Sequence, residues 1–207
     1  MAPSDSVPER RYPGRAAYKL LGALEDMPDL RAMIEGRVCL DIGAAHGGFT
    51  RVLLEAGAAK VYALDVAYGM LDFNLRRDER VVPLERKNVR HIERSWFAPE
   101  DFTHAPWFLT CDAAFISLGT VLAAVAPVLA EAPPVAWDGV FLVKPQFEDS
   151  RSAEGGVVRD QARRLELLEA VRERARTLGL VVGVDRPARI TGQKGNQEYC
   201  LVLSTER

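Results

Sequence analysis

The chain alternates between short apolar runs and segments whose apolar residues recur at helical spacing. The apolar runs predict seven strands, at 38–42, 61–65, 81–84, within 108–115, and at 139–144, 180–184 and 198–203. Helical spacing predicts a first helix at 15–25 and further helices between the strands, at 49–56, 69–76, 118–130 and 163–178. Residues 88–106 show no clear period and are predicted to form an irregular connection.

The predicted strands are mostly apolar along their whole length, which indicates a sheet covered on both faces. Their alternation with helices predicts an α/β fold with a doubly wound, mainly parallel sheet. Residues 185–197 leave no room for a crossover helix, so we expect the last two strands to pair antiparallel. Residues 1–13 contain three prolines and mixed charges and are predicted to be a flexible lead-in, followed by a single domain at 14–207.

Composition and charge narrow the classes of function. Of the 207 residues, 48% are hydrophobic and 27% are charged, as in ordinary globular domains. The net charge of −2 provides no chain-wide basic surface, so any binding of nucleic acid has to rest on local patches. No apolar run reaches the roughly 18 residues that span a bilayer, and the first residues carry no signal-peptide core. We therefore expect a cytoplasmic protein that does not contact membranes.

The positions of cysteine and histidine argue against a metal site. Cys39, Cys111 and Cys200 lie singly in apolar runs, and they are expected to be buried, reduced thiols. The three histidines show no spacing typical of metal ligands. The sequence therefore predicts no metal.

A glycine-rich loop follows the first predicted strand. Asp41 lies inside the end of that strand, and Gly43, Gly47 and Gly48 occupy the turn into the next helix. Glycine lets the backbone approach a ligand closely, and the amides at a helix N-terminus suit a carboxylate. In open α/β sheets, ligands bind beyond the carboxyl ends of the strands, which is where this loop is expected to lie.

The spacing within this loop discriminates between cofactors. It is G-x-x-x-G-G, whereas the dinucleotide fingerprint needs G-x-G-x-x-G and a P-loop needs Gly-Lys-Ser/Thr. Asp41 would repel a pyrophosphate but can receive an ammonium group, and Asp65 ends the next strand, where it can accept ribose hydroxyls. These residues indicate a nucleoside cofactor with an amino-acid end. The alternative is a glycine turn used for packing, beside a solvated acid.

Two charged residues end neighbouring predicted strands. Lys144 ends the fifth apolar run and Asp112 the fourth, so both are expected on one rim of the sheet, within reach of an ion pair. In group transfer to a hydroxyl, a lysine beside another cation can accept a proton, and a charged lysine can stabilise a developing oxyanion. A structural ion pair without a catalytic role is an equal alternative.

Several distinctive strings follow one another along the chain. They are RAAYKL at 15–20, DIGAAHGGFT at 41–50, DVAYGMLD at 65–72, FISL at 115–118, KPQFE at 144–148, GGVVRD at 155–160, ITG at 190–192 and GNQE at 195–198. Over roughly residues 15–203 the chain thereby resembles the FtsJ-like methyltransferase family, in particular its TlyA-type, hemolysin-like branch.

The resemblance implies a Rossmann-like methyltransferase fold, S-adenosylmethionine as methyl donor, and ribose 2′-O-methylation of ribosomal RNA. It implies a catalytic tetrad that is matched here by Lys19, Asp112, Lys144 and Glu198. Lys19 would be the second cation, and Glu198 would orient Lys19 or the substrate hydroxyl. The predicted cofactor-binding residues are Asp41, Gly43, Ala44, His46, Gly47, Gly48, Phe49, Asp65, Val66, Asn88 and Asp112.

The chain departs from the family pattern in ways that affect substrate binding. TlyA-type proteins normally begin with a small RNA-binding module, for which there is no room before Tyr12. Gly14 and His46 replace small hydroxyl residues, and Glu154 replaces an expected lysine. RNA contact is therefore expected from local patches. Residues 1–19 and 151–164 each hold four basic and two acidic side chains, a net +2, around Arg10–Lys19 and Arg151–Arg164.

Other interpretations stay open at this stage. Solvated loop charges explain the two patches equally well. A small hydroxylated metabolite is an alternative methyl acceptor, and a non-catalytic cofactor-binding protein is a third hypothesis, against which the full tetrad argues. Five aromatic residues of the irregular connection and the following strand either stack on RNA bases or anchor the connection to the core: Trp96, Phe97, Phe102, Trp107 and Phe108.

Overall fold

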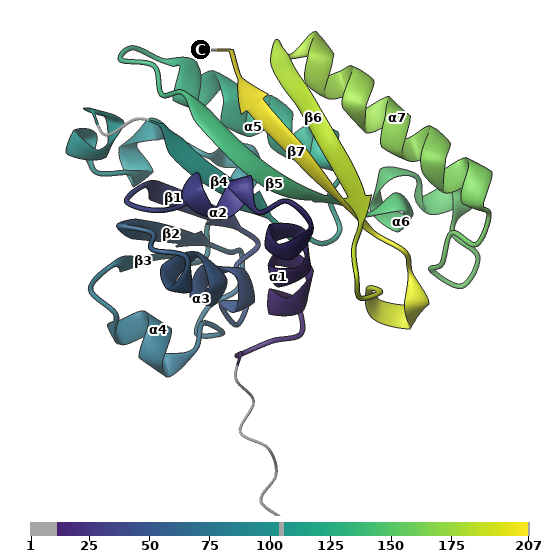
Figure 1. The fold of residues 1–207 in the computed structure, drawn as a ribbon, viewed down its shortest axis with the longest axis horizontal. Coiled ribbons are helices and arrows are strands. Elements are labelled where there is room, and N and C mark those ends of the chain that lie inside the picture. Colours follow the sequence, from purple (N-terminus) through teal and green to yellow (C-terminus); the bar gives the residue numbers. More distant parts are fainter. Residues whose placement is uncertain (1–11, 104–105, 207) are drawn as a thin grey trace, which may run out of the picture.

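A computed structural model describes residues 12–103 and 106–206, which form one seven-stranded sheet of order β3-β2-β1-β4-β5-β7-β6 (Figure 1). β7 pairs antiparallel with both β5 and β6, and the other neighbouring strands pair parallel. The predicted doubly wound sheet with an antiparallel last strand is therefore confirmed. The strands are β1 (Val38–Ile42), β2 (Lys60–Leu64), β3 (Val81–Leu84), β4 (Trp107–Cys111), β5 (Trp137–Val143), β6 (Leu180–Pro187) and β7 (Tyr199–Thr205).

Helices cover both faces of the sheet, as expected for strands that are apolar on both sides. One face carries α1 (Ala17–Asp26), α2 (Asp29–Ala32), α3 (Gly48–Glu55) and α4 (Phe73–Arg77). The other face carries α5 (Leu118–Ala130) and α7 (Gln161–Thr177), and the short α6 (Pro145–Glu148) follows β5. Short 3₁₀ turns are η1 (Val89–His91), η2 (Arg94–Trp96), η3 (Pro99–Thr103), η4 (Ser150–Ser152) and η5 (Gln193–Gly195).

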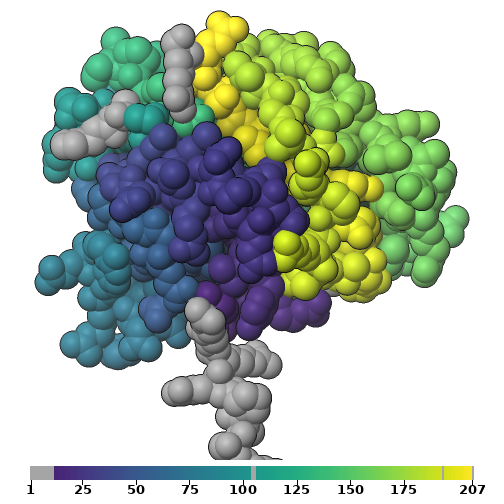
Figure 2. Space-filling model, in the orientation of Figure 1, coloured from purple at the N-terminus to yellow at the C-terminus, as the bar shows by residue number. Residues whose placement is uncertain are grey.

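The N-terminal helix packs against the segment that joins β6 to β7. In Figure 2 the purple α1 region adjoins the yellow segment before β7 on the molecular surface. Arg189 of that segment forms ion pairs with Glu25 and Asp26 at the end of α1. The Arg15 guanidinium donates a hydrogen bond to the carbonyl of Thr191, at 3.3 Å. These contacts bring two distant parts of the chain together.

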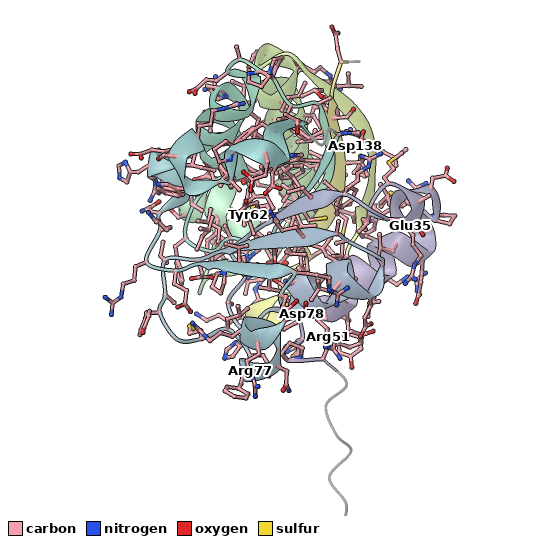
Figure 3. The ribbon with its side chains drawn as sticks, turned by 90° about the vertical axis from the view of Figure 1, so that its left-hand side faces the viewer. Glu35, Arg51, Tyr62, Arg77, Asp78 and Asp138 are labelled. Carbon is pink, nitrogen blue, oxygen red and sulfur yellow. The ribbon has the colours of Figure 1, made fainter. Side chains whose placement is uncertain are left out.

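The irregular connection between β3 and β4 is anchored by its aromatic side chains. Phe97 and Phe102 are each 4% exposed, and their rings lie 5.4 and 5.2 Å from the ring of Trp107. Tyr62 of β2 packs into the same group and lies inside the molecule in Figure 3. Phe108 is also fully buried. These four aromatic residues of the predicted set are therefore buried in the core, whereas the fifth, Trp96, is half-buried with the Lys87 amine 4.4 Å from its ring centroid.

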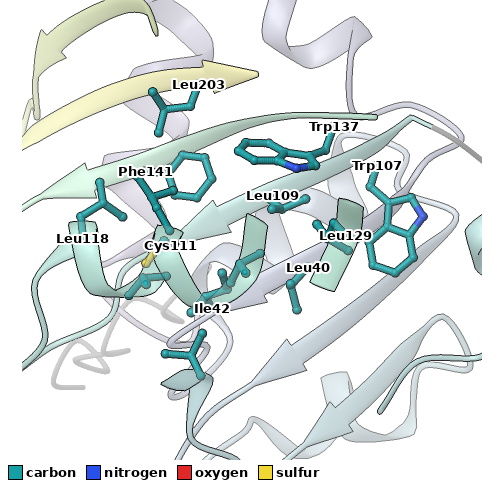
Figure 4. Close-up of a cluster of buried hydrophobic side chains, with 14 of the residues drawn as sticks. Leu40, Ile42, Trp107, Leu109, Cys111, Leu118, Leu129, Trp137, Phe141 and Leu203 are labelled. Atoms are coloured by element: carbon teal, nitrogen blue, oxygen red, sulfur yellow. The ribbon is translucent and has the colours of Figure 1, made fainter. Parts of the chain in front are cut away.

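Large side chains fill the space between the sheet and α5 and α7 (Figure 4). Trp107, Trp137 and Phe141 are almost completely buried there. The three free cysteines, Cys39, Cys111 and Cys200, are buried as well, as the sequence predicts. Within 12–103 and 106–206, no helix is long and apolar enough to cross a membrane.

Most predicted elements agree with the structure to within a few residues, but the helix expected at 69–76 is shorter. It begins at Phe73, because the Asp72 side chain accepts hydrogen bonds from the amides of Asn74 and Leu75 and so caps the first turn. The sequence did not predict α2 and α6, which have four residues each and are too short to show a helical period.

Candidate active site

The loop after β1 takes its shape from a glycine that no other residue can replace without strain. Gly43 has φ +82°, and a Cβ added to it would lie 2.8 Å from the Ala113 backbone. The Gly43 and Ala44 amides donate to the carbonyl of Leu64, at 2.8 and 3.1 Å. The loop is therefore fixed between the ends of β2 and β4, with its backbone at the rim of the sheet.

Asp65 ties the end of β2 to this loop. One of its carboxylate oxygens accepts the Ala45 amide and the other accepts the Ala67 amide, each at 2.8 Å. Each carboxylate oxygen has a second lone pair, so Asp65 keeps capacity to accept further hydrogen bonds. Its position at a strand end, facing a cavity, is the one that the sequence predicts.

Asp41 lies beneath the loop and not at its surface. Its side chain is fully buried, and its two carboxylate oxygens accept the hydroxyls of Thr50 and Thr110, at 2.7 and 3.0 Å. Burial raises the Asp41 pKa to about 6, although the two hydroxyl hydrogen bonds oppose this rise. Asp41 therefore places negative charge under the loop without lining a cavity, which differs from the direct contact expected from the sequence.

Two cavities meet at the glycine loop. The larger measures about 600 Å³ and the smaller about 430 Å³. Both are lined by Gly43, Ala45, Asp112, Ala114 and Phe115, so they share one wall. Both cavities lie at the rim of the sheet where ligands bind in open α/β folds.

The predicted cofactor-binding residues are distributed over these two cavities. Asp65, Val66 and Asn88 line the larger one, and Ala44, His46, Gly48 and Phe49 line the smaller one. Gly43 and Asp112 line both. Gly47, like Asp41, lines neither, because it packs against the side chains of Leu71 and Leu75.

The four residues of the predicted tetrad form one network of alternating charge. Lys144 Nζ lies 2.6 Å from Asp112 Oδ1, and it donates to the Asp112 carbonyl at 3.0 Å. Lys19 Nζ lies 3.5 Å from the same Oδ1 and 2.6 Å from Glu198 Oε2. Both lysines and Glu198 are buried, with 8%, 7% and 2% exposure for Lys19, Lys144 and Glu198. All four side chains also line the smaller cavity.

Strand register accounts for half of this network. β4 and β5 are parallel neighbours with Cys111 opposite Phe141, so Asp112 and Lys144 leave the sheet on the same rim. Lys19 comes from α1 and Glu198 from the residue before β7. They meet because α1 packs against the segment between β6 and β7.

Two residues that the sequence analysis did not assign support Glu198. The Gln146 amide nitrogen lies 3.5 Å from Glu198 Oε1, and its own oxygen, Oε1, is buried without a partner among the described residues. A Cβ on Gly192 would lie 2.1 Å from Glu198 Oε1, so only glycine permits this close approach. Both residues belong to the family-like strings KPQFE and ITG, but nothing in their spacing indicated a role.

Phe115 is a further residue that the sequence analysis missed. It has φ +62°, its side chain is 86% exposed, and its ring lies 5.2 Å from that of Phe147. A non-glycine residue with positive φ is uncommon and is often found at functional sites. Phe115 therefore forms an apolar edge where the two cavities meet.

The structure gives limited support to the two predicted basic patches. Arg163 pairs with Asp149 and Glu166, and Arg151 also pairs with Asp149. Arg164 donates to the carbonyls of residues 158 and 159. In the other patch, Arg10 and Arg11 lie outside the described residues, and Lys19 belongs to the buried network.

Comparison with known proteins agrees with this geometry. A family model described as FtsJ-like methyltransferase matches residues 12–205. The 16S/23S rRNA (cytidine-2'-O)-methyltransferase TlyA of Mycobacterium tuberculosis is 44% identical over 201 residues, which cover 96% of this chain and 70% of TlyA. Hemolysin A of Brachyspira hyodysenteriae is 36% identical over 191 residues, which cover 91% of this chain and 75% of that protein.

A solved structure shows the same similarity. The crystal structure of a Lactococcus lactis protein described as a hemolysin has 35% sequence identity and a TM-score of 0.84, and the match covers 96% of this chain and 90% of that one. The sheet order, the glycine loop and the family match point to one conclusion. The chain belongs to the FtsJ-like methyltransferase family and is an S-adenosylmethionine-dependent methyltransferase.

Proposed function

We propose that this protein methylates the 2′-hydroxyl of a ribose in ribosomal RNA. The observation that carries the proposal is the buried Lys144–Asp112–Lys19–Glu198 network on the wall of the smaller cavity. The name of the M. tuberculosis relative, which is 44% identical over nearly the whole chain, supports this acceptor. Hydroxyl methylation needs positioning and removal of a proton, and the network offers groups for both.

The two cavities fit a nucleoside that carries an amino-acid end. In this proposal Asp65, with one lone pair free on each oxygen, accepts the ribose hydroxyls, and Val66 and Asn88 line the base. The amides of the glycine loop hold the carboxylate end beside His46 and Phe49. The buried Asp41 carboxylate, directly under the loop, favours a cation above it. Gly43 leaves the space that a Cβ would fill.

When bound, the cofactor supplies an electrophilic methyl group, and its transfer to a hydroxyl requires removal of the hydroxyl proton. We assign proton acceptance to Lys144, whose amine lines the smaller cavity and is held by two oxygens of Asp112. An uncharged lysine is the accepting form. Lys19 contacts the same Asp112 Oδ1, so the two lysines share one carboxylate oxygen.

Glu198 fixes Lys19 in the network. Its Oε2 lies 2.6 Å from Lys19 Nζ, and Glu198 is only 2% exposed. A charged pair that is this well buried holds its geometry tightly, because separating the two charges leaves each without a partner. In this proposal Glu198 thus orients Lys19, and Lys19 in turn keeps the Asp112 carboxylate close to Lys144.

The test is methyl transfer from labelled S-adenosylmethionine to ribosomal RNA and to ribosomal subunits. We expect label in a 2′-O-methylated nucleoside, identified after digestion by mass spectrometry and by resistance of the adjacent phosphodiester to alkali. Lys144→Met is expected to lower kcat by about 10²–10⁴-fold, because it removes the proton acceptor, with cofactor affinity nearly unchanged.

Two further variants separate proton acceptance by Lys144 from its positive charge. Lys144→Arg keeps the positive charge but cannot accept a proton at neutral pH, so it should be as inactive as Lys144→Met. Lys194→Met, at an exposed lysine outside the network, serves as the matched control and should remain active. Undiminished turnover in Lys144→Met would refute the assigned role. Labelling of a small hydroxylated metabolite with no labelling of any RNA would refute the acceptor.

A further inference from the structure

The connection from β2 to α4 exposes an unusual number of apolar side chains. Val66, Tyr68, Met70 and Phe73 are 65%, 66%, 41% and 66% exposed, all within eight residues. Val66 and Met70 line the larger cavity and are accounted for by the cofactor site. Tyr68 and Phe73 line neither cavity, so the cofactor site does not account for their exposure.

An arginine guanidinium lies over each of these two rings. The Arg86 guanidinium lies 4.3 Å from the centroid of the Tyr68 ring, and that of Arg77 lies 5.4 Å from the Phe73 ring. Neither arginine forms an ion pair with any residue in 12–103 or 106–206. Arg77 lies at the edge of the molecule on α4 in Figure 3. We call these four residues, Tyr68, Phe73, Arg77 and Arg86, the aromatic–arginine surface.

One carboxylate holds the two halves of this surface together. Glu85 accepts the amide of Gly69 at 2.9 Å, and it also forms an ion pair with Arg76 of α4. The loop that carries Tyr68 is thereby fixed to the helix that carries Phe73 and Arg77. The hydrogen bond from Arg76 is the main cause that holds the Glu85 pKa below its ordinary value, with a smaller contribution from the charge of Arg86, and the Arg77 and Arg86 side chains are exposed.

The backbone at Arg86 adopts a left-handed conformation. Arg86 has φ +54°, a conformation that glycine or asparagine adopts at lower cost, and its amide bonds to the carbonyl of Ala67 at 3.2 Å. The turn alone would favour glycine at this position. The turn therefore does not explain why this position holds an arginine, and we look for a role of its side chain, which lies over the Tyr68 ring.

We infer that the aromatic–arginine surface binds unpaired nucleotides of the RNA substrate, beside the larger cavity. This inference rests on the proposed function. Stacked aromatic rings with cations beside them are the combination that binds single-stranded nucleic acid: the rings stack on bases and the arginines bind phosphates. Lys87 and Arg90 continue the positive charge into the wall of the larger cavity, so the surface is continuous with the site.

A second copy of the chain is the other occupant that an apolar surface suggests. In a symmetric dimer the same residues from both copies would meet, and Arg77 and Arg86 would then face their own duplicates. Across residues 66–90 there are six basic and four acidic side chains, a net +2. Asp78 and Glu85 pair with Arg80 and Arg76, which leaves four basic side chains against Asp72 and Glu79. Charge complementarity therefore favours a polyanion.

The test measures binding of a single-stranded RNA and of the methylated ribosomal RNA, at several salt concentrations. Tyr68→Ala and Phe73→Ala are each expected to weaken binding by about 5- to 100-fold, from the loss of one base-stacking contact. Arg77→Ala combined with Arg86→Gly should reduce the slope of log affinity against log salt by about 1.4, which is about 0.7 for each lost phosphate contact. Arg86→Gly also relieves the backbone, so it cannot act by unfolding the turn.

Enzyme kinetics, RNA affinity with its salt slope, and oligomeric state separate this inference from its alternatives. All variants should keep the wild-type cofactor affinity and the wild-type kcat at saturating RNA, and only KM for RNA should rise. Arg31→Ala, an exposed arginine on α2 before the amino end of β1, is the control for loss of charge. Unchanged RNA affinity and salt slope in an active enzyme would overturn the inference alone. Conversion of a wild-type dimer to monomer by Tyr68→Ala would also overturn it. Failure of the wild type to bind or methylate RNA would overturn the proposed function as well.

Discussion

The buried carboxylate of Asp41 makes a prediction about stability that can be worked out from its surroundings. Its pKa rises from 3.8 to about 6, chiefly because burial disfavours the charged form. The folded state then binds this proton more tightly than the unfolded state does, so the free energy of unfolding falls as pH rises from about 4 to about 6. Above pH 6 the full cost of the buried charge is present.

The size of this cost follows from the shift. A difference of about 2.2 pKa units corresponds to about 3 kcal/mol at pH 8, at 1.36 kcal/mol per unit. At pH 5 the Asp41 carboxyl is mostly protonated in the folded state, and the same two pKa values give a cost of about 1.6 kcal/mol. Asp41→Asn keeps the shape and removes the charge. Its stability relative to wild type should therefore improve by about 1.4 kcal/mol between pH 5 and pH 8.

Urea denaturation of both proteins at pH 5 and pH 8 measures this difference, and comparison of the two pH values cancels any constant effect of the amide. Thr110→Val is the complementary variant. It removes a hydrogen bond to the charged carboxylate, 3.0 Å long in the wild type, so it should destabilise the protein more at pH 8 than at pH 5. An Asp41→Asn effect that is equal at the two pH values, or that moves the other way, would refute the reasoning.

Two further predictions concern the site and the core. Gly192→Ala places a Cβ 2.1 Å from Glu198 Oε1, so the Glu198 side chain has to move. We expect kcat to fall at least about 10-fold in single-turnover methylation, with cofactor affinity unchanged. A full rate in this variant would show that the position of Glu198 does not matter. Phe141→Ala removes a ring that is completely buried beside Trp137, and it should lower the free energy of unfolding by about 3–5 kcal/mol in urea. A loss below about 1 kcal/mol would mean that the core closes around the missing ring.

The fold could be predicted from the sequence because its strands are short, apolar and punctuated by glycine. The alternation of apolar runs with helical periods suffices to order the elements, and the short 185–197 connection suffices to make β7 antiparallel. Boundaries set by a single side chain are harder to predict. The Asp72 cap delays α4 to Phe73, and the Lys144-Pro145 step starts the four-residue α6, which leaves no periodic signal.

The cofactor loop was also largely predictable, since glycines and acids at successive strand ends indicate a ligand by chemistry alone. What the sequence does not encode locally is which side of the loop each residue faces. Asp41 and Gly47 belong to the same short segment as the residues that line the cavities. Asp41, however, lies under the loop, and Gly47 packs on Leu75. Tyr68 and Phe73 could not be placed from the sequence either. Large apolar residues are usually buried, but both of these side chains are exposed.

The tetrad shows where local reasoning ends. Asp112 and Lys144 follow adjacent parallel strands, so sheet register alone predicts their meeting. Lys19 and Glu198 are separated by 179 positions, and their 2.6 Å contact depends on how α1 packs against the segment before β7. The Arg189 ion pairs to Glu25 and Asp26 and the Arg15 bond to Thr191 hold that packing at the surface, where ion pairs are weak. The sheet thus supplies one half of the network rigidly, while the other half depends on surface contacts that are easier to break. Because Lys19 and Lys144 share one oxygen of Asp112, movement of α1 alone would change the charge around Lys144 without moving it.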